Sequence, residues 1–592
     1  MKLKKAFNTI GRKHLIMGTA ALPLLIAAQA QGIEFYGAGV EATLDSQISV
    51  GSSFRVEDQD QRLLDKKNNN LGDSNYKNGD AFSQIFKGSH DLQVNYENFG
   101  AFVRGKYWYD AALENNDNLS DDGNHELAKF SGATVLDAFV YGSFEVANMP
   151  LDVRLGKQAV SWGESIFIGG GINAINPYDG SALRRPGAEL KEGLLPTNMA
   201  FASVALTNNL SAEAFYQLEF HESVTVACGT YFSTNDYQSQ GCESDVTTSP
   251  QTNDIKRHEN AIRRPDADGQ FGMAFRYFSD ALDTEFGFYA MNIHSRAPIV
   301  SGTKSVGVND LAVFSTTKTF LMSAAGGSRD AVTATKMAQG AVVNANADSQ
   351  TFFVEYPEDI QIAGLSFATN IASVAVAGEF SHKQNTPFQI NSTQLSGSGL
   401  TGELQVATGS TDPYLLALNE VEDGANVDGY RTFDVSQAQV SAIKLFDQVL
   451  GASRVTLIGE AAYRFTHGFD DNDGIFFSGA APKTDATTGI TTSENSATES
   501  SWGYRARVMA QYNDVFSGVN LTPALSFRHD VNGVSGAPSG NFKEGTKVTG
   551  LSVKADYRNT YNAALSYTQF EGEDNDYKTD RDFAAVSVGM QF

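Results

Sequence analysis

The residues that could carry acid–base or metal chemistry are few and scattered along this chain. It has nine histidines, and neither a G-x-S-x-G nucleophile elbow nor an H-E-x-x-H zinc motif occurs. His529 and Asp530 are adjacent, but neighbouring side chains on an extended strand point to opposite faces, so these two cannot readily pair. We therefore expect no catalytic residue, no cofactor and no metal site, and a hydrolase is kept only as a third alternative.

Charge is the chemistry that this sequence offers in quantity. Asp and Glu number 69 against 44 Lys and Arg, which gives a formal net charge of −25. Because an acidic surface repels phosphate, nucleic acid is not expected as a partner. The acidic stretches, such as 57–60, 470–474 and 571–576, lack the spacing of a calcium-binding EF-hand loop. We interpret them as solvated surface.

Residues 1–30 have the three parts of a secretory signal peptide. Basic residues between 2 and 13 precede an apolar stretch from Leu15 to Ala27, and a small-x-small cleavage site ends at Ala30. Removal of five basic residues takes the net charge from −25 to −30. No later stretch has 18 consecutive apolar residues, which excludes a helical membrane protein. We expect an exported chain, cleaved near Ala30, in which 31–592 form a single domain.

Alternation with a period of two runs along the mature chain. In residues 453–466, Leu457 and Tyr463 share one face, while Glu460 and Arg464 share the other. The polar face carries charge in many of these segments, and aromatic residues concentrate near their ends. Apolar side chains facing lipid and polar side chains facing a water-filled interior produce this pattern in an outer-membrane β-barrel.

The lengths of the connections give a second signal. Short links, near 97–100, 147–150, 207–210, 279–284, 369–371, 446–452, 513–518 and 558–562, alternate with long ones, near 57–87, 113–132, 163–196, 222–268, 294–356, 384–430, 468–500, 531–546 and 571–579. Barrels of the outer membrane have short periplasmic turns and long external loops. The pattern predicts an all-β, transmembrane, antiparallel barrel of about 18 strands (range 16–18) with both termini in the periplasm.

The last strand ends in Phe592, and its side chains alternate from Ala584 onward. Such an end resembles the signal that the barrel-assembly machinery of Gram-negative bacteria recognises. We therefore expect this machinery, outer-membrane lipid and lipopolysaccharide to be partners of the chain in the cell outer membrane.

The long link at 163–196 combines apolar and charged residues. An apolar run that includes Ile168, Ile172 and Ile175 should not stand in water on a free loop. We expect this loop to fold into the lumen and to narrow it. The candidate constriction residues are Trp162, Glu164, Asn176, Asp179, Arg184, Arg185, Glu189, Lys191 and Glu192. A loop that is tucked in only for stability is the alternative.

Cys228 and Cys242 lie in one predicted outer loop with 13 residues between them. Because exported proteins meet an oxidising environment, we expect a disulfide between them. A redox or metal role would need neighbouring groups that the sequence does not show.

Nine short motifs, in order along the chain, resemble the Gram-negative family known as domain of unknown function 1302. They include 155–158, 161–165, 171–177, 185–192, 356–360, 378–381, 501–505, 529–533 and 580–583, followed by the terminal Phe592. The resemblance implies an outer-membrane protein that accompanies a periplasmic or lipoprotein partner and an inner-membrane exporter of the RND type. Charges in the motifs, among them Glu164, Arg185, Glu189, Asp530 and Arg581, are expected to form a network that holds the inward loop.

Two functions follow from these expectations. The first is a porin-like channel through which a small, possibly hydrophobic, compound crosses the outer membrane. The second is a plugged barrel that serves as the outer-membrane partner of a periplasmic protein or an RND-type exporter. Open-channel conductance distinguishes them.

Overall fold

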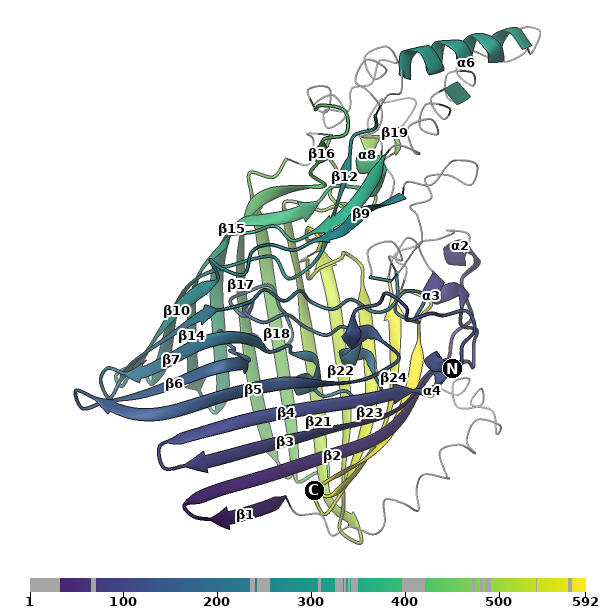
Figure 1. Cartoon of the computed structure of the whole chain (residues 1–592). Helices are drawn as coiled ribbons and strands as arrows, with labels where there is room; N and C mark the ends of the chain where they lie inside the picture. The colour runs from purple at the N-terminus through teal and green to yellow at the C-terminus, as the bar shows by residue number, and fades with distance from the viewer. Residues whose placement is uncertain are drawn as a thin grey trace.

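The period-two segments form eighteen antiparallel strands that close into a barrel (Figure 1). The barrel closes where the last strand pairs with the first over Gln47–Arg55. The predicted architecture and strand number are confirmed. The strands are β2 (Val40–Arg55), β3 (Ala81–Tyr96), β4 (Phe99–Asp110), β5 (Ser131–Val146), β6 (Met149–Gln158), β7 (Thr197–Ala205), β8 (Leu210–Gln217), β10 (Phe271–Ser279), β11 (Thr284–Ile293), β14 (Ile360–Ile371), β15 (Val374–Gln389), β17 (Tyr430–Asp447), β18 (Arg454–His467), β21 (Ser500–Phe516), β22 (Val519–Asn532), β23 (Lys547–Tyr557), β24 (Tyr561–Glu571) and β25 (Phe583–Gln591).

This structure is a computed structural model. It describes residues 32–592 except for 65–70, 235–239, 242–255, 307–309, 325–333, 335–336, 339–340, 342–349, 397–420, 471–473, 480–482, 485–490, 539 and 573–577. The signal peptide predicted at 1–30 lies outside the described residues. None of the described helices is both long and apolar enough to span a membrane.

The two faces of the wall follow the alternation of the sequence. On β18, Leu457 and Tyr463 are exposed on the outer surface, whereas Glu460 and Arg464 are buried on the inner side. The pairing of β18 with both of its neighbours is continuous, so its backbone groups are satisfied within the wall. An apolar outside and a polar inside are the arrangement that a membrane-spanning barrel requires.

Short turns join the strands at one end of the barrel, and long loops join them at the other (Figure 1). Four of the turns have only two residues, and in three of these both residues have positive φ: Ala147 and Asn148, Ala372 and Ser373, and Ser517 and Gly518. Such turns have the backbone twist that suits an antiparallel hairpin. β2 begins and β25 ends at the short-turn end, as predicted for both termini.

Three of the long links together form structure beyond the barrel. A four-stranded sheet consists of β9 (Lys256–Arg263), β12 (Ile299–Thr303), β13 (Thr351–Glu355) and β16 (Asn426–Val427). Val300, Phe352, Phe388 and Phe477 belong to the apolar core beneath it. Smaller elements are β19 (Lys483–Thr484), β20 (Thr491–Thr492), α2 (Gln61–Leu64), α3 (Leu71–Ser74), α4 (Ala111–Glu114), η2 (Glu126–Ala128), η3 (Ala182–Arg184), α5 (Leu190–Gly193), α6 (Asp310–Ala324) and α8 (Ser392–Ser396).

One short strand extends the barrel at the short-turn end. β1 (Ile33–Gly37) pairs with β2 over Val40–Leu44, on the same edge that β25 occupies further along β2. All five of its residues are exposed. No strand is predicted from the sequence at this stretch.

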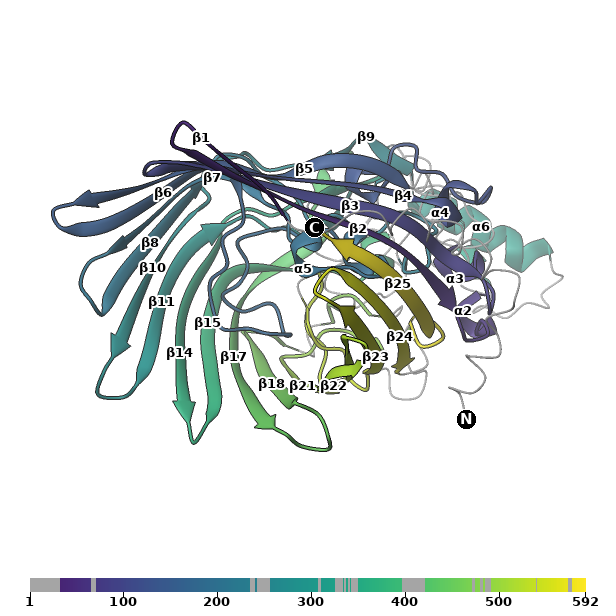
Figure 2. The same cartoon turned by 90° about the horizontal axis from the view of Figure 1, so that it is seen from below.

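The link between β6 and β7, residues 159–196, is here called the inward segment. Seen from the short-turn end, its helix α5 lies within the outline of the barrel (Figure 2). The predicted inward course of this loop is confirmed.

Candidate constriction site

Two buried carboxylates of the barrel wall hold the first half of the inward segment. Glu379 on β15 accepts hydrogen bonds from the backbone N–H groups of Glu164, at 2.6 Å, and Ile172, at 3.0 Å. Glu460 on β18 accepts three more, from the N–H groups of residues 166–168, at 2.7 to 2.8 Å. Because an ionised acceptor strengthens each hydrogen bond, these contacts fix the path of the segment along one wall.

The close approach to Glu379 explains two glycines of the segment. A Cβ atom on Gly171 would lie 2.0 Å from Oε1 of Glu379, so the carboxylate would have to leave its position beside the segment. Gly163 has a φ of +88°, and a Cβ there would lie 2.5 Å from Oε2 of the same carboxylate. Glycine is needed here both for the backbone conformation and for access to the wall.

The apolar residues of the segment pack against a third part of the wall. Trp162, Ile172 and Ile175 are fully buried in a core with Met199 and Phe215. The indole N–H of Trp162 donates to the carboxylate of Glu213, at 2.7 Å. Trp162, a candidate constriction residue, is therefore an anchor of the segment and does not face open space.

Not all of the apolar run is buried. Ile166 and Phe167, which precede Ile168 in the same run, remain exposed within the barrel, so the expectation that the run packs in the lumen holds only in part. Ile166 and Glu164 line a pocket of about 470 Å³ on the short-turn side of the segment, opposite wall residues such as Asn370 and Ser441. The interior therefore retains open volume next to the segment.

The charge on Glu164 is destabilised by its surroundings. Burial raises the pKa of its carboxyl; Arg276 opposes the rise, and the carboxylates of Glu285 and Glu379 add to it. Three carboxyl groups and one guanidinium thus meet on this side of the interior.

Two buried ion pairs hold the second half of the inward segment to the opposite side of the barrel. Nζ of Lys87 on β3 lies 2.7 Å from Glu192, and Nζ of Lys106 on β4 lies 3.0 Å from Asp179. Asp179 also accepts a hydrogen bond from the N–H of Ala182 at the start of η3. Since each ammonium lies against a carboxylate, the charges compensate one another.

Three further candidate residues have local roles. Glu189 accepts a hydrogen bond from Gln47 on β2, at 2.7 Å, and lies 3.3 Å from Lys191. Asn176 bonds through its amide to the backbone of Val160 and so closes the first part of the segment on itself.

Arg184 and Arg185 lie against aromatic rings. The Arg184 guanidinium is 4.7 Å from the ring centre of Phe232, and that of Arg185 is 4.4 Å from the ring centre of Trp108. Burial lowers the pKa of both groups, that of Arg184 to about 10, and the positive charge of Arg581 also lowers the pKa of Arg184. Arg184 therefore remains charged at neutral pH, and guanidinium groups in general stay protonated in proteins.

His529 and Asp530 have different partners. Asp530 is fully buried between Arg505, at 2.8 Å, and Arg528, at 2.6 Å. The ring of His529 packs against that of Tyr504. The two side chains do not meet, as the alternation along β22 predicts.

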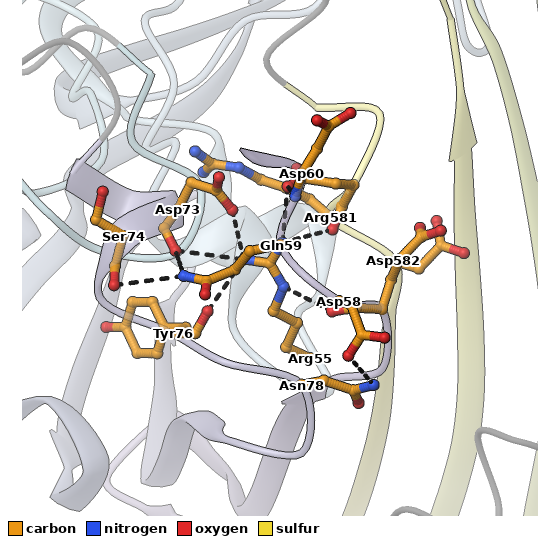
Figure 3. Close-up of polar contacts among 12 residues, drawn as sticks. Arg55, Asp58, Gln59, Asp60, Asp73, Ser74, Tyr76, Asn78, Arg581 and Asp582 are labelled. Carbon is orange, nitrogen blue, oxygen red and sulfur yellow. Dashed lines mark hydrogen bonds and ion pairs between the residues drawn. The ribbon is translucent and has the colours of Figure 1, made fainter. Parts of the chain in front are cut away.

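A buried cluster that sequence reasoning missed ties the outer loops together at the barrel seam (Figure 3). Arg55, at the end of β2, contacts Asp73 at 2.5 Å and Asp580 at 2.8 Å, and donates to the carbonyl of Tyr76. Arg581 donates to the carbonyl of Tyr231. The charges expected to hold the inward segment are thus divided: Arg581 serves the seam, while Glu164, Arg185 and Glu189 contact separate parts of the wall.

Cys228 is disulfide-bonded. Its predicted partner, Cys242, lies outside the described residues. In the part of the chain that the structure describes, no three His, Cys, Asp or Glu side chains lie together as a metal site would require.

The anchors Lys87, Lys106 and Glu379 were not among the predicted site residues. All three lie on the polar face of an alternating strand, and this pattern could have flagged them as inward charges. The pattern does not show which loop they meet, because their partners lie about 73 to 215 residues away.

Comparison with known proteins places this arrangement in context. Residues 13–592 match the family described as "Protein of unknown function (DUF1302)". Among curated proteins, none matches the sequence.

Several solved structures resemble this one distantly. OccAB1 of Acinetobacter baumannii is 10% identical, with a TM-score of 0.39 and coverage of 95% of this chain and 99% of the other. OpdK of Pseudomonas aeruginosa, solved with vanillate, is 11% identical, with a TM-score of 0.37 and coverage of 93% and 98%. A BenF-like porin from Pseudomonas fluorescens Pf-5 is 9% identical, with a TM-score of 0.39 and the same coverage.

Proposed function

The chain belongs to the DUF1302 family, a family described only as of unknown function, and we propose from the geometry that it is an outer-membrane channel narrowed by the inward segment. The observation that carries this proposal is the attachment of that segment to two sides of the barrel. Glu379 and Glu460 hold its first half, and Lys87 and Lys106 hold its second half.

The outer surface supports a position within a membrane. Exposed apolar residues such as Phe380, Val440, Leu457 and Val586 occur on strands around the barrel. A closed barrel satisfies its own backbone hydrogen bonds, which hydrocarbon demands. Long loops at one end and short turns at the other fit the outer membrane of a Gram-negative bacterium, reached after cleavage near Ala30.

The interior supports passage of a small compound. Eighteen strands enclose a lumen that stays aqueous unless loops fill it. The pocket of about 470 Å³ beside Ile166 and Glu164 shows that the inward segment does not fill it completely. The exposed side chains of Ile166 and Phe167 give this space an apolar side, which suits a compound with apolar parts.

Single-channel conductance in a planar bilayer tests the proposal. The native chain is compared with a variant lacking residues 166–182, which removes the part of the segment between Glu460 and η3. A native current that rises on deletion supports a channel narrowed by this segment. Absence of current from both forms contradicts it.

One observation favours the second function, a plugged barrel that binds a periplasmic protein, a lipoprotein or an RND-type exporter. β1 is exposed along its whole length at the short-turn end, and Phe35 and Tyr36 are 56% and 71% exposed. A short strand with a free edge can be extended by a strand of a partner. In this case deletion of β1 abolishes binding of the partner and leaves the conductance as it was.

A further inference from the structure

Arg184 and Arg185 project from the inward segment into a second pocket, on the long-loop side of the barrel interior. The pocket measures about 60 Å³, which holds about four water molecules or one small anionic head group. Rings of Trp108, Phe130 and Phe232 form much of its lining. The two guanidinium groups are its principal cations.

These arginines differ from the other cations that meet the inward segment. Lys87 and Lys106 each contact a buried carboxylate within 3.0 Å. Across the described residues, no carboxylate lies within 4.0 Å of the guanidinium of Arg184 or Arg185. Arg185 donates only to the backbone carbonyl of Leu127, at 3.2 Å.

The one carboxylate that lines the same pocket is already engaged. Asp110 accepts hydrogen bonds from the hydroxyl of Ser83 and from the backbone N–H groups of Gln84 and Ala112, at 2.5 to 3.1 Å. Its carboxylate oxygens are therefore occupied by hydrogen bonds from β3 and from the start of α4. Asp110, Asp179 and Glu192 act on Arg185 only from beyond ion-pair distance. Neither guanidinium group forms an ion pair with a described residue, so the pocket suits an anion.

The aromatic rings orient the two guanidinium groups without neutralising them. A guanidinium that stacks on a ring leaves its N–H edge free to donate two parallel hydrogen bonds to a carboxylate. Phe232 also packs edge-on against Phe82 and Phe583, which fixes the ring beneath Arg184. The positive charge of Arg581 adds to that of Arg184.

We propose that this pocket binds the anionic head group of a small organic carboxylate or sulfonate, and that the aromatic rings beside the arginines contact its apolar body. This inference rests on the proposed channel and names the class of compound that passes through it. Arg184 and Arg185 are binding residues for the head group, since both line the pocket and neither forms an ion pair with a described residue.

Trp108 provides a direct measurement, because its ring lies beneath Arg185. The probe is cyclohexanecarboxylate, and cyclohexylmethanol is the uncharged analogue of the same shape. Purified full-length protein is titrated with each while tryptophan emission is recorded, and a Trp108→Phe variant shows which part of the signal comes from this residue. We expect a saturable change with the carboxylate and none with the alcohol.

The variant Arg184→Gln/Arg185→Gln should bind the carboxylate at least about tenfold more weakly, as expected when charged hydrogen bonds are lost. Arg454→Gln, at an exposed site beside Asp447, should bind as the native protein does. Should the double Gln variant fail to fold, Arg184→Lys/Arg185→Lys keeps the charge, and the comparison of carboxylate with alcohol on native protein still decides.

Equal responses to carboxylate and alcohol, or equal affinity of the native protein and the Gln variant, would overturn the site. If inorganic phosphate binds as tightly as the carboxylate, the proposed contact between the aromatic rings and an apolar body is wrong. If the protein conducts ions but does not bind the carboxylate, the proposed site is wrong and the proposed channel stands. If the protein binds the carboxylate but does not conduct ions, the proposed site stands and the proposed channel is wrong.

Discussion

Nζ of Lys106 lies 3.0 Å from the carboxylate of Asp179, and both side chains are buried inside the barrel. The pair joins strand β4 to the middle of the inward segment. The two residues are 73 positions apart in the sequence. Their contact holds the middle of the inward segment against β4.

Replacing Asp179 by Asn leaves the Lys106 ammonium buried without its counter-charge. Removing one partner of such a pair costs about 3–5 kcal/mol. We expect a lower thermal midpoint and a larger single-channel conductance, because the second half of the segment loosens. Lys191→Met is the matched control, since Lys191 pairs with Glu189 at a partly exposed position and should change stability by less than about 1 kcal/mol. Equal effects of the two substitutions would contradict the assigned role of Asp179.

Replacing Glu379 and Glu460 by Gln weakens the attachment of the first half. A glutamine side chain has one acceptor oxygen, whereas the carboxylate that it replaces has two. Each hydrogen bond that is lost, or that no longer has a charged acceptor, lowers the free energy of attachment by about 1 kcal/mol. We expect larger and more variable currents from the double variant. Asp447→Asn, at an exposed position near a short turn, should conduct like the native protein. Unchanged currents in the double variant would show that the segment does not limit conduction.

The contacts of Glu189 predict that the attachment of the inward segment, and with it the conductance, depends on pH. Burial alone would raise the pKa of its carboxyl, but the hydrogen bond from Gln47 and the charge of Lys191 hold it below the ordinary value of 4.5. A carboxyl with a depressed pKa stabilises the folded state above pH 4.5, and this contribution is lost as the pH falls through the folded pKa.

Conductance measured from pH 7 down to pH 3 should therefore rise at the acidic end. Glu189→Gln should remove the part of the rise that Glu189 causes. Glu41→Gln, near the short turns, should retain it. The assignment fails if native protein and Glu189→Gln follow the same curve.

Reduction of the disulfide at Cys228 should destabilise the outer loop between β8 and β10. A ring closed over the 13 intervening residues to Cys242 contributes about 3 kcal/mol in the chain-entropy treatment. We expect faster proteolysis of this loop after reduction, and the same in Cys228→Ser. Two free thiols in denatured, unreduced protein would contradict the pairing.

Much of the barrel wall could be predicted from the sequence. Leu457 and Glu460 fall on opposite faces of β18 because the strand period is two, whatever surrounds the strand. The short links were equally clear, since two-residue turns such as Ala147–Asn148 leave little room for other structure.

The attachment of the inward segment could not be predicted in the same way. The apolar run around Ile172 showed that the segment must pack, but the choice of Glu379 as its anchor depends on barrel closure and strand tilt. The sheet formed by β9, β12, β13 and β16 was missed for a related reason. Its strands are short and pair across long stretches of chain, one pair in parallel, and period-two counting within one link cannot show such pairing.

The position of β1 has a consequence for how the barrel closes. β25 pairs with β2 over Gln47–Arg55, and β1 occupies the same edge of β2 from Val40 to Leu44. The backbone of Phe592 meets that of Ser46 just above this boundary. A one-residue slip of the last strand would turn every side chain of β25 to the wrong face. The N-terminal hairpin occupies the part of this edge onto which a slipped last strand would move, and this favours a single register when the first and last strands join.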